Sequence, residues 1–294
     1  MKSFIKKTFV CVFVGSLCIV NNAEAQFPPL FRPVDKYKVE DACLYNAYYD
    51  LVFYPYGKEK SVIVGGVKHQ EEHDITLVQI GKNVMHSFSY EQFKNDSLNT
   101  ILAAKGRNTY SMKQEVFQSN VYRYLKESKI TLIYRTILFG PIYSYTEQEI
   151  PIKWEISSDK DTLSNYLCQK ATCTFLGRHY TAWFTSDIPF SAGPYKFGGL
   201  PGLIVKIADE TNDYEWSLRS FTRAASDETI KLYKWPYQSI TRAKMADIVR
   251  RMNNNPYMFL ESIGAKFHVG NSDSYSYISL PYNPIELDLE QKNK

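Results

Sequence analysis

The stretch that decides the fold reads Gly193-Pro-Tyr-Lys-Phe-Gly-Gly-Leu-Pro-Gly-Leu-Ile-Val-Lys-Ile207. Its first part is rich in Gly and Pro, and its last part is apolar and β-branched, which favours a strand. Pro201 and Gly202 suit the centre of a type II turn, because Pro presets φ and Gly tolerates a positive φ. We therefore predict a structural turn at Gly199, Pro201 and Gly202 that leads into a strand from Leu203 to Asp209.

The residues upstream of this turn form a long loop. Ser186 to Gly199 has neither a helical nor a strand period, and a structureless segment of that length is usually functional or disordered. Its aromatic residues argue against disorder. We predict that the loop forms a rim or lid at which Asp187, Tyr195, Lys196 and Phe197 contact a ligand or partner, since two rings flanking a cation suit a mixed apolar and polar surface.

The hexapeptide Gly199-Leu-Pro-Gly-Leu-Ile204 resembles the one that names the GLPGLI family of exported Bacteroidota proteins. The resemblance covers most of the mature chain and extends over Cys168-Gln-Lys-Ala171, Gly177-Arg178, Tyr180-Thr-Ala-Trp-Phe184, Asp187-Ile-Pro189 and Tyr282-Asn-Pro-Ile-Glu-Leu287. It implies an exported protein of the cell envelope whose activity has not been established. The resemblance therefore transfers no catalytic residue.

The N-terminus has the pattern of a secretory signal peptide. Basic residues are followed by an apolar run from Thr8 to Val20 and by Ala23-Glu-Ala25, a small-residue cleavage site. We predict a signal peptide over residues 1–25 and a single β-rich domain over residues 26–294. No later segment has the apolar length of a transmembrane helix. The expected location is the periplasm or the outer membrane, with secretion as the alternative.

Charge narrows the range of partners. The formal net charge is +4, and loss of Lys2, Lys6, Lys7 and Glu24 with the signal peptide would leave +2. Because this near-neutral chain scatters its basic residues among acidic ones, neither nucleic acid nor an anionic membrane is an expected partner. We expect an outer-membrane or periplasmic protein, a lipid or a peptide, and no cofactor.

Three cysteines follow the predicted signal peptide: Cys43, Cys168 and Cys173. In an oxidising envelope an odd number suggests one disulfide and one remaining thiol. Cys168 and Cys173 would face opposite sides of a straight strand, so a bridge would join Cys43 to one of them. Three buried thiols that behave as small apolar residues are the alternative. The absence of CxxC spacing in the sequence disfavours a zinc site.

Short apolar runs separated by Gly, Pro and Asn predict many strands. We expect them over residues 48–54, 61–64, 75–80, 84–88, 116–125, 129–138, 152–156, 166–175, 178–185, 203–209 and 214–221. Helices are expected between Ser89 as N-cap and Gly106, from Thr241 to Met252, and over a short stretch from Pro256 to Ile263. This order predicts a mainly β (α+β) fold: a single curved antiparallel sheet or half-barrel with one or two packed helices.

Two sequence patterns invite a catalytic interpretation. His69-Gln-Glu-Glu-His73 matches the H-x-x-E-H pattern of zinc peptidases, but that chemistry needs a helix, and Gly65-Gly66 and the strand from residue 75 leave no room for one. We expect a hairpin tip instead. Ser191, His179 and Asp187 are close in sequence, yet a triad requires that the side chains meet in space.

Tyrosines gather near the N-terminal strands, where Tyr45, Tyr48, Tyr49, Tyr54 and Tyr56 surround Phe53. They either line an apolar concavity or fill the faces of the sheet. We name no catalytic residue and expect a non-enzymatic envelope binding or accessory protein. The alternatives are an envelope hydrolase with its site near the loop, and a scaffold that pairs with a partner through a sheet edge.

Overall fold

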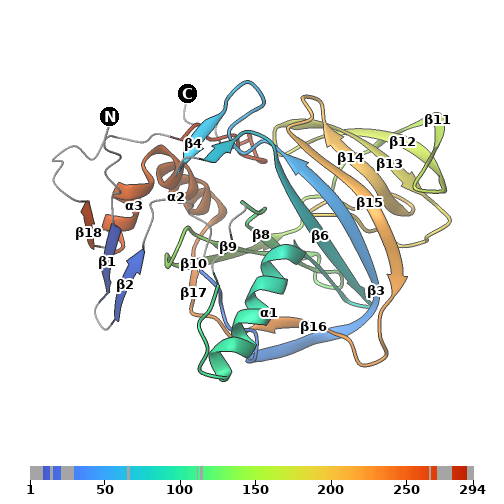
Figure 1. Ribbon diagram of the computed structural model, residues 1–294. Coiled ribbons are helices and arrows are strands. Elements are labelled where there is room, and N and C mark those ends of the chain that lie inside the picture. Colours follow the sequence, from blue (N-terminus) through green and yellow to red (C-terminus); the bar gives the residue numbers. More distant parts are fainter. Residues whose placement is uncertain are drawn as a thin grey trace, which may run out of the picture.

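The computed structural model describes residues 9–13, 16–20, 30–64, 67–110, 112, 115–264, 266–269 and 280–289. Its main body is one 13-stranded sheet (Figure 1). In spatial order the strands are β11 (Glu155–Leu163), β12 (Tyr166–Phe175), β13 (Arg178–Thr185), β14 (Leu203–Asp209), β15 (Tyr214–Arg223), β3 (Tyr37–Phe53), β6 (Glu72–Gly81), β7 (Val84–Ser89), β8 (Ser119–Tyr124), β9 (Lys129–Arg135), β10 (Ile142–Gln148) and β17 (Tyr237–Ser239), and β16 (Thr229–Tyr233) pairs with β3. The mainly β fold class predicted from the sequence is confirmed.

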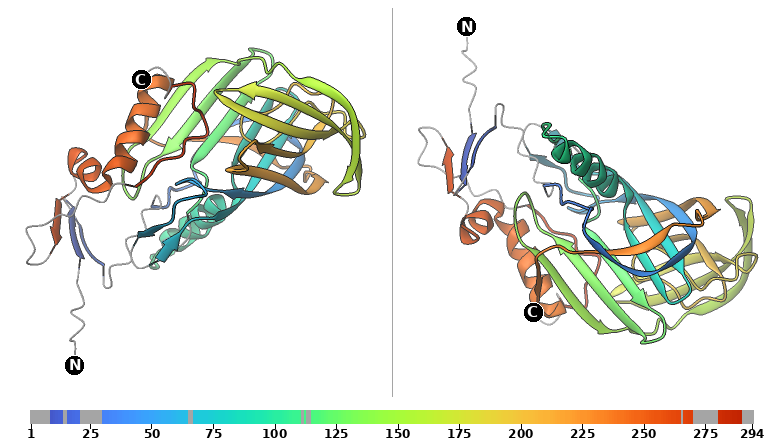
Figure 2. Two further views of the ribbon diagram at one scale, coloured as in Figure 1. Left: turned by 90° about the horizontal axis from the view of Figure 1, so that it is seen from above. Right: turned by 90° about the horizontal axis from the view of Figure 1, so that it is seen from below.

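The sheet curls strongly, and its two arms enclose the core (Figures 1 and 2). One cluster of buried side chains joins Leu132 and Tyr145 on β9 and β10 to Phe175 and Tyr180 on β12 and β13. These strands lie in opposite arms of the sheet, so their inner faces share one apolar interior. Neither β11 nor β17 closes the sheet onto the other arm, which makes the body an open half-barrel.

Strand pairing is antiparallel with one exception. Ile142 of β10 lies opposite Tyr237 of β17 in a parallel pair, whereas the sequence predicted an antiparallel sheet throughout. Of the strands in the main sheet, β10, β16 and β17 were not predicted. β16 and β17 are short, and β17 is mostly exposed, so their residues lack the regular alternation of a half-buried strand.

The three predicted helices are present. α1 (Tyr90–Ala104) begins at the expected N-cap, because the Ser89 hydroxyl accepts a bond of 3.1 Å from Gln92 N, and Gly106 follows it with a φ of +64°. α2 (Arg242–Asn254) and α3 (Pro256–Ser262) lie together at one end of the body. α1 packs against β6 and β7, and α2 packs against β10.

α1 buries its polar face, which reverses the apolar stripe that the sequence predicted. Gln92, Asp96 and Asn99 face the sheet, whereas Leu98 and Ile101 are 50% and 53% exposed. The cause is a buried ion pair, because the Asp96 carboxylate binds the Arg135 guanidinium, with 3.2 Å between Oδ1 and Nη2. A buried cation this close to the helix is costly unless it is paired, so a carboxylate is favoured at this position over an apolar side chain.

The three cysteines that follow the predicted signal peptide form no disulfide with one another. Cys43, Cys168 and Cys173 are free and buried, so the predicted bridge from Cys43 is wrong and the alternative of three buried thiols holds. Cys43 belongs to a second, smaller apolar cluster on the other face of the sheet, while Cys168 and Cys173 belong to the main core. The sheet itself separates the sulfur atoms.

Two small sheets stand beside the main one. β1 (Phe9–Phe13), β2 (Ser16–Val20) and β18 (Lys266–Val269) form a three-stranded sheet, and β4 (Val62–Val64) pairs with β5 (Val67–His69). The predicted cleavage site at residues 23–25 and the predicted turn at residues 65–66 lie outside the described residues. Among the helices that are described, none is long and apolar enough to cross a membrane.

Candidate functional site

The loop from Ser186 to Gly199, called here the Gly/Pro loop, fills the interior of the curled sheet. Tyr195, Lys196 and Phe197 are only 3%, 2% and 0% exposed, so the predicted rim with these three side chains at the surface is wrong. Phe197 packs edge-on against Tyr180, with ring centroids 4.7 Å apart, and also contacts Phe175. Two arms of a curled sheet leave an apolar space between them, and the aromatic loop occupies it. Of the predicted contact residues, only Asp187 is exposed.

Lys196 is the centre of a buried ionic network. Its Nζ donates to the Tyr145 hydroxyl at 2.8 Å, and lies 3.1 Å from Glu147 Oε1 and 2.7 Å from Glu286 Oε1. Burial would raise the pKa of Glu286, but the Lys196 ammonium and the Arg242 guanidinium hold that pKa below its ordinary value. An ammonium buried this deeply is tolerated only because carboxylates surround it.

The same network fixes the C-terminal residues 280–288, called here the strap. Arg242 on α2 binds Glu286 through Nε at 2.7 Å and holds Asp288 with two bonds of 2.8 and 2.6 Å. Asn283 accepts a bond of 2.6 Å from Arg178 Nη2, so the strap is also tied to β13. The strap therefore links the loop, α2 and β13 at one end of the half-barrel.

The turn that ends the loop is built differently from the predicted one. Gly199 has the positive φ, at +87°, whereas Gly202 is not among the residues with positive φ. Gly202 is required by space, because a Cβ there would lie 2.0 Å from the Thr185 carbonyl oxygen. All three residues of the predicted structural turn lie in the connection from the loop to β14, but the type II geometry is wrong.

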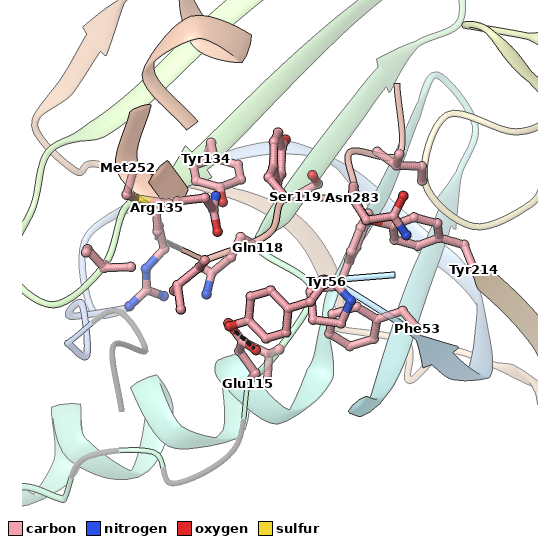
Figure 3. A pocket seen from close by; sticks show the side chains of 18 of the residues that line it. Phe53, Tyr56, Glu115, Gln118, Ser119, Tyr134, Arg135, Tyr214, Met252 and Asn283 are labelled. Atoms are coloured by element: carbon pink, nitrogen blue, oxygen red, sulfur yellow. Dashed lines mark hydrogen bonds between the residues drawn. The ribbon is translucent and has the colours of Figure 1, made fainter. Parts of the chain in front are cut away.

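The candidate site is a cavity at the end of the half-barrel beneath the strap (Figure 3). We call it the end cavity, and its volume is about 130 Å³. Strand ends, α2, the start of α3 and the strap all contribute to its wall. Its lining is mostly apolar and includes Phe53, Tyr56, Val116, Phe117, Tyr134, Ile137, Tyr214, Met252, Pro256, Leu280 and Ile285. A space of this size accepts one aromatic or aliphatic group.

The Gly/Pro loop supports the back of this cavity. The Tyr195 ring packs edge-on against Phe117 with centroids 5.6 Å apart, and Phe117 lines the end cavity. Trp216 also contacts Phe117 from within the core, at 5.7 Å. The loop residue predicted to touch a ligand thus lies one side chain behind the wall and holds it in place.

A few polar groups interrupt the apolar lining. The Tyr56 hydroxyl donates to the two oxygens of Glu115 at 3.0 and 3.1 Å. Burial and the Glu115 carboxylate raise the pKa of Tyr56, so its hydroxyl keeps the proton that it donates. Gln118, Arg135 and Asn283 line other parts of the wall. Such a pattern can orient a ligand within the cavity.

The side chains of the hydrolase alternative are engaged elsewhere. His179 Nδ1 lies 2.7 Å from the Thr174 hydroxyl on the neighbouring strand, and Ser191 Oγ accepts a bond of 2.8 Å from Gly199 N. Within the described part of the chain, no hydrogen bond joins His179, Ser191 and Asp187 to one another. Their proximity in sequence does not become a catalytic arrangement.

The H-x-x-E-H pattern spans the connection from β5 to β6, which belong to different sheets, so the expected hairpin tip is wrong. Its first residue ends β5 and its last belongs to β6, so the two residues do not share a helical face. His73 is exposed and lies 3.0 Å from Glu71 Oε1. Over the described ranges, no group of three or more His, Cys, Asp or Glu side chains could hold a metal ion.

The scaffold alternative concerns the sheet edge at β11. Most of β11 is exposed, but its pairing with β12 shifts register between Ile156 and Lys160. It also carries Asp159 and Asp161 on either side of Lys160. A register shift and charged side chains are the features with which proteins prevent edge-to-edge pairing.

The residues that surround the end cavity were not predicted as a site. They come from six separate parts of the sequence, and no local motif connects them. Phe53 and Tyr56 belonged to the aromatic cluster for which an apolar concavity was one of two interpretations. Both interpretations hold for parts of that cluster, because Tyr49 is buried in the sheet core, whereas Tyr45, Tyr48 and Tyr54 are half-buried.

Known proteins resemble parts of the chain. Residues 176–206 match the family described as "Protein of unknown function (Porph_ging)". This stretch contains Gly199-Leu-Pro-Gly-Leu-Ile204, so the chain is similar there to a Bacteroidota-type family of unknown function, while the GLPGLI name stays a resemblance. No curated protein matches the chain.

Two solved structures of PNGF-II are also similar to it. The structure in space group P21 is 13% identical with a TM-score of 0.43, and the match covers 70% of this chain and 33% of that one. The structure in space group C2 is 13% identical with a TM-score of 0.44, and the match covers 72% and 34%. The chain spans about a third of the length of these structures. We draw no functional conclusion from them.

Proposed function

We propose that the chain is a non-enzymatic binding protein of the cell envelope, whose ligand places an apolar group in the end cavity. The observation that carries this proposal is the cavity itself, about 130 Å³ in volume and lined by rings, Met252 and a few polar groups. Enclosed apolar cavities with a few convergent polar groups are the usual form of small ligand sites. The signal-peptide pattern of residues 1–25 supports export to the periplasm or outer membrane.

The contacts that hold the wall support a preformed cavity. The strap that covers the cavity is held by Arg178 and by Arg242, and Phe117 at the back is held by the buried Tyr195. A preorganised cavity binds without a loss of side-chain freedom, which favours affinity. The hydroxyl and imidazole of the hydrolase alternative lie outside this lining.

Binding can be measured through the methyl group of Met252, which lines the cavity. We expect p-cresol to shift the ¹³C-methyl resonance of Met252 saturably, because its ring fits the volume. Met258 is the internal reference, since it is 57% exposed and does not line the cavity. Equal shifts at both methyl groups, or no shift at Met252, would contradict the proposed function.

A filled cavity provides the second arm of the test. Ile137 lines the end cavity, so Ile137→Phe should abolish the p-cresol shift while the protein stays folded. Ile156→Phe is the matched control, because Ile156 is 48% exposed on β11, away from the cavity. Retained binding in I137F would show that p-cresol binds elsewhere.

A further inference from the structure

A narrow space of about 20 Å³ lies beneath α1 and is called here the helix pocket. Gln92 and Asp96 line it from the helix, and Arg135 lines it from the end of β9. The helix pocket lies where α1 buries polar side chains in place of its apolar ones. A space this small admits one water molecule or one monatomic ion and excludes an organic ligand.

Three buried polar atoms have no hydrogen-bond partner among the described residues, and their side chains all line the helix pocket. They are Gln92 Nε2, Arg135 Nε and Gln118 Oε1. The two terminal nitrogens of Arg135 bind the Asp96 carboxylate, and Nη2 also donates to the Leu30 carbonyl at 2.6 Å. These bonds fix the guanidinium, so its Nε–H cannot turn to another acceptor. Because an unpaired buried donor or acceptor is costly, the three atoms indicate a bound partner.

The chemistry of the three atoms selects among occupants of this size. Gln92 Nε2 and Arg135 Nε are donors, whereas Gln118 Oε1 is an acceptor. A water molecule can accept two hydrogen bonds and donate one, and three bonds are typical of a buried water. A halide ion would leave the Gln118 oxygen without a donor and would also meet the Asp96 carboxylate. A metal cation would face two N–H groups that it cannot bind.

We propose that the helix pocket binds one water molecule, which accepts hydrogen bonds from Gln92 and Arg135 and donates one to Gln118. The water connects α1 to the sheet on the face where the helix has few apolar contacts. Gln118 and Arg135 also line the end cavity, so the same water holds two side chains of its wall (Figure 3). The proposal does not depend on the proposed function, because no compound in the end cavity takes part in it.

Solution NMR tests the proposal through the side-chain amide of Gln92. The bound water should give a direct Overhauser effect to the Gln92 Nε2 hydrogens, measured in the rotating frame, where chemical exchange has the opposite sign. Asn99 is the control on the same helix, because its buried Nδ2 donates to Asn95 Oδ1 at 3.0 Å and to the Tyr110 carbonyl at 2.7 Å. Its amide should show no effect. No direct effect at Gln92, or equal effects at both amides, would contradict the proposal.

A crystal structure of the protein grown in sodium bromide distinguishes water from an ion. We predict one peak of electron density within about 3.2 Å of all three unpaired atoms, without anomalous signal at the bromine absorption edge. Anomalous signal at this position would replace the water by a halide. A direct hydrogen bond between Gln92 Nε2 and Gln118 Oε1, with no peak in the helix pocket, would refute the proposal.

A variant of Gln118 tests the acceptor. Gln118→Met keeps the length of the side chain and removes the oxygen, so the occupancy of the water should fall by at least about half in crystals of Q118M. Gln169→Met is the matched control, because Gln169 lies on β12 and does not line the helix pocket, and it should retain the water. Full occupancy in Q118M would contradict the bond to Gln118. The unfolding midpoint shows whether each variant is folded.

Discussion

At the scale of single residues, the hexapeptide Gly199-Leu-Pro-Gly-Leu-Ile204 combines two different demands for glycine. Gly199 adopts a φ of +87°, a conformation that side chains with a Cβ rarely adopt. Gly202 lies so close to the Thr185 backbone that no Cβ fits. The sequence correctly indicated that both glycines are structural, but it could not distinguish a constraint on φ from a constraint on space.

Gly202→Ala should therefore destabilise the protein strongly, by about 3 kcal/mol, because the backbone of β13 must move to admit the methyl group. Gly57→Ala is the comparison, since Gly57 has a φ of +82° and no atom within 4 Å of the added Cβ. The strain of a positive φ alone should make G57A cost about 1 kcal/mol. Urea unfolding of both variants measures the difference. A smaller loss of unfolding free energy for G202A than for G57A would mean that Gly202 does not lie as close to the Thr185 backbone as described.

His86 gives a prediction on pH. It is buried between the rings of Phe88 and Tyr122, and burial lowers the pKa of His86 to about 3, although the hydrogen bond that His86 Nε2 donates to Asn120 Oδ1 opposes this. Since the unfolded chain binds the proton below its ordinary pKa of 6.5, the contribution of His86 to stability is complete above that pH. It is lost progressively as the pH falls from 6.5 towards 3.

The comparison with His86→Gln isolates this effect, because glutamine does not titrate. We expect the free energy of unfolding of the unmodified protein, minus that of H86Q, to fall by about 2 kcal/mol between pH 7 and pH 5. Chemical denaturation at the two pH values measures this quantity. A difference that stays constant would show that His86 is accessible to protons in the folded state.

At the scale of elements, the loop, α2 and the strap depend on one buried cation. Lys196 lies between Glu147 and Glu286, and Glu286 continues to Arg242 on α2. Lys196→Met should destabilise the protein by about 3–5 kcal/mol, because two partly or fully buried carboxylates lose a partner. Thermal or urea unfolding measures the loss.

A surface pair provides the control for Lys196. Lys206 and Glu215 form an ion pair of 2.9 Å in which both side chains are about one-third exposed. Lys206→Met should change the free energy of unfolding by less than about 1 kcal/mol, since water screens the pair. Similar losses for K196M and K206M would indicate that the network around Lys196 contributes no more than a surface contact.

The elements also show where sequence patterns carry information and where they do not. The N-cap Ser89, the helix near Thr241 and the strands on both sides of Gly177 were predicted well, because caps, turns and alternation are local signals. β16 and β17 were not predicted, because they form by pairing with strands that are distant in the sequence and show no local pattern of their own. The inward polar face of α1 was not predicted, because Asp96 pairs with Arg135, a residue 39 positions away in the sequence.

The site was less predictable than the fold for the same reason. Tyr195, Lys196 and Phe197 have the composition of an exposed binding surface, yet the curled sheet buries them. The end cavity joins Phe53 to Met252 and Leu280, which only the closed tertiary structure brings together. Sequence reasoning recognised the aromatic richness around Phe53 but had no means of placing the opposite wall.

At the scale of the whole molecule, the half-barrel is filled by its own loop and keeps free space at one end. The Gly/Pro loop occupies the interior, and the strap and α2 cover the end cavity without filling it (Figures 1 and 3). The segment that matches a family thus has an architectural role, and the proposed binding role belongs to residues outside it.

The most direct measurement is a crystal structure of the protein soaked with p-cresol. We predict electron density for its ring in the end cavity, between Phe53 and Met252. Density for the probe only at other sites, or an end cavity closed by side chains that admit no probe, would contradict the assignment of this cavity as the ligand site.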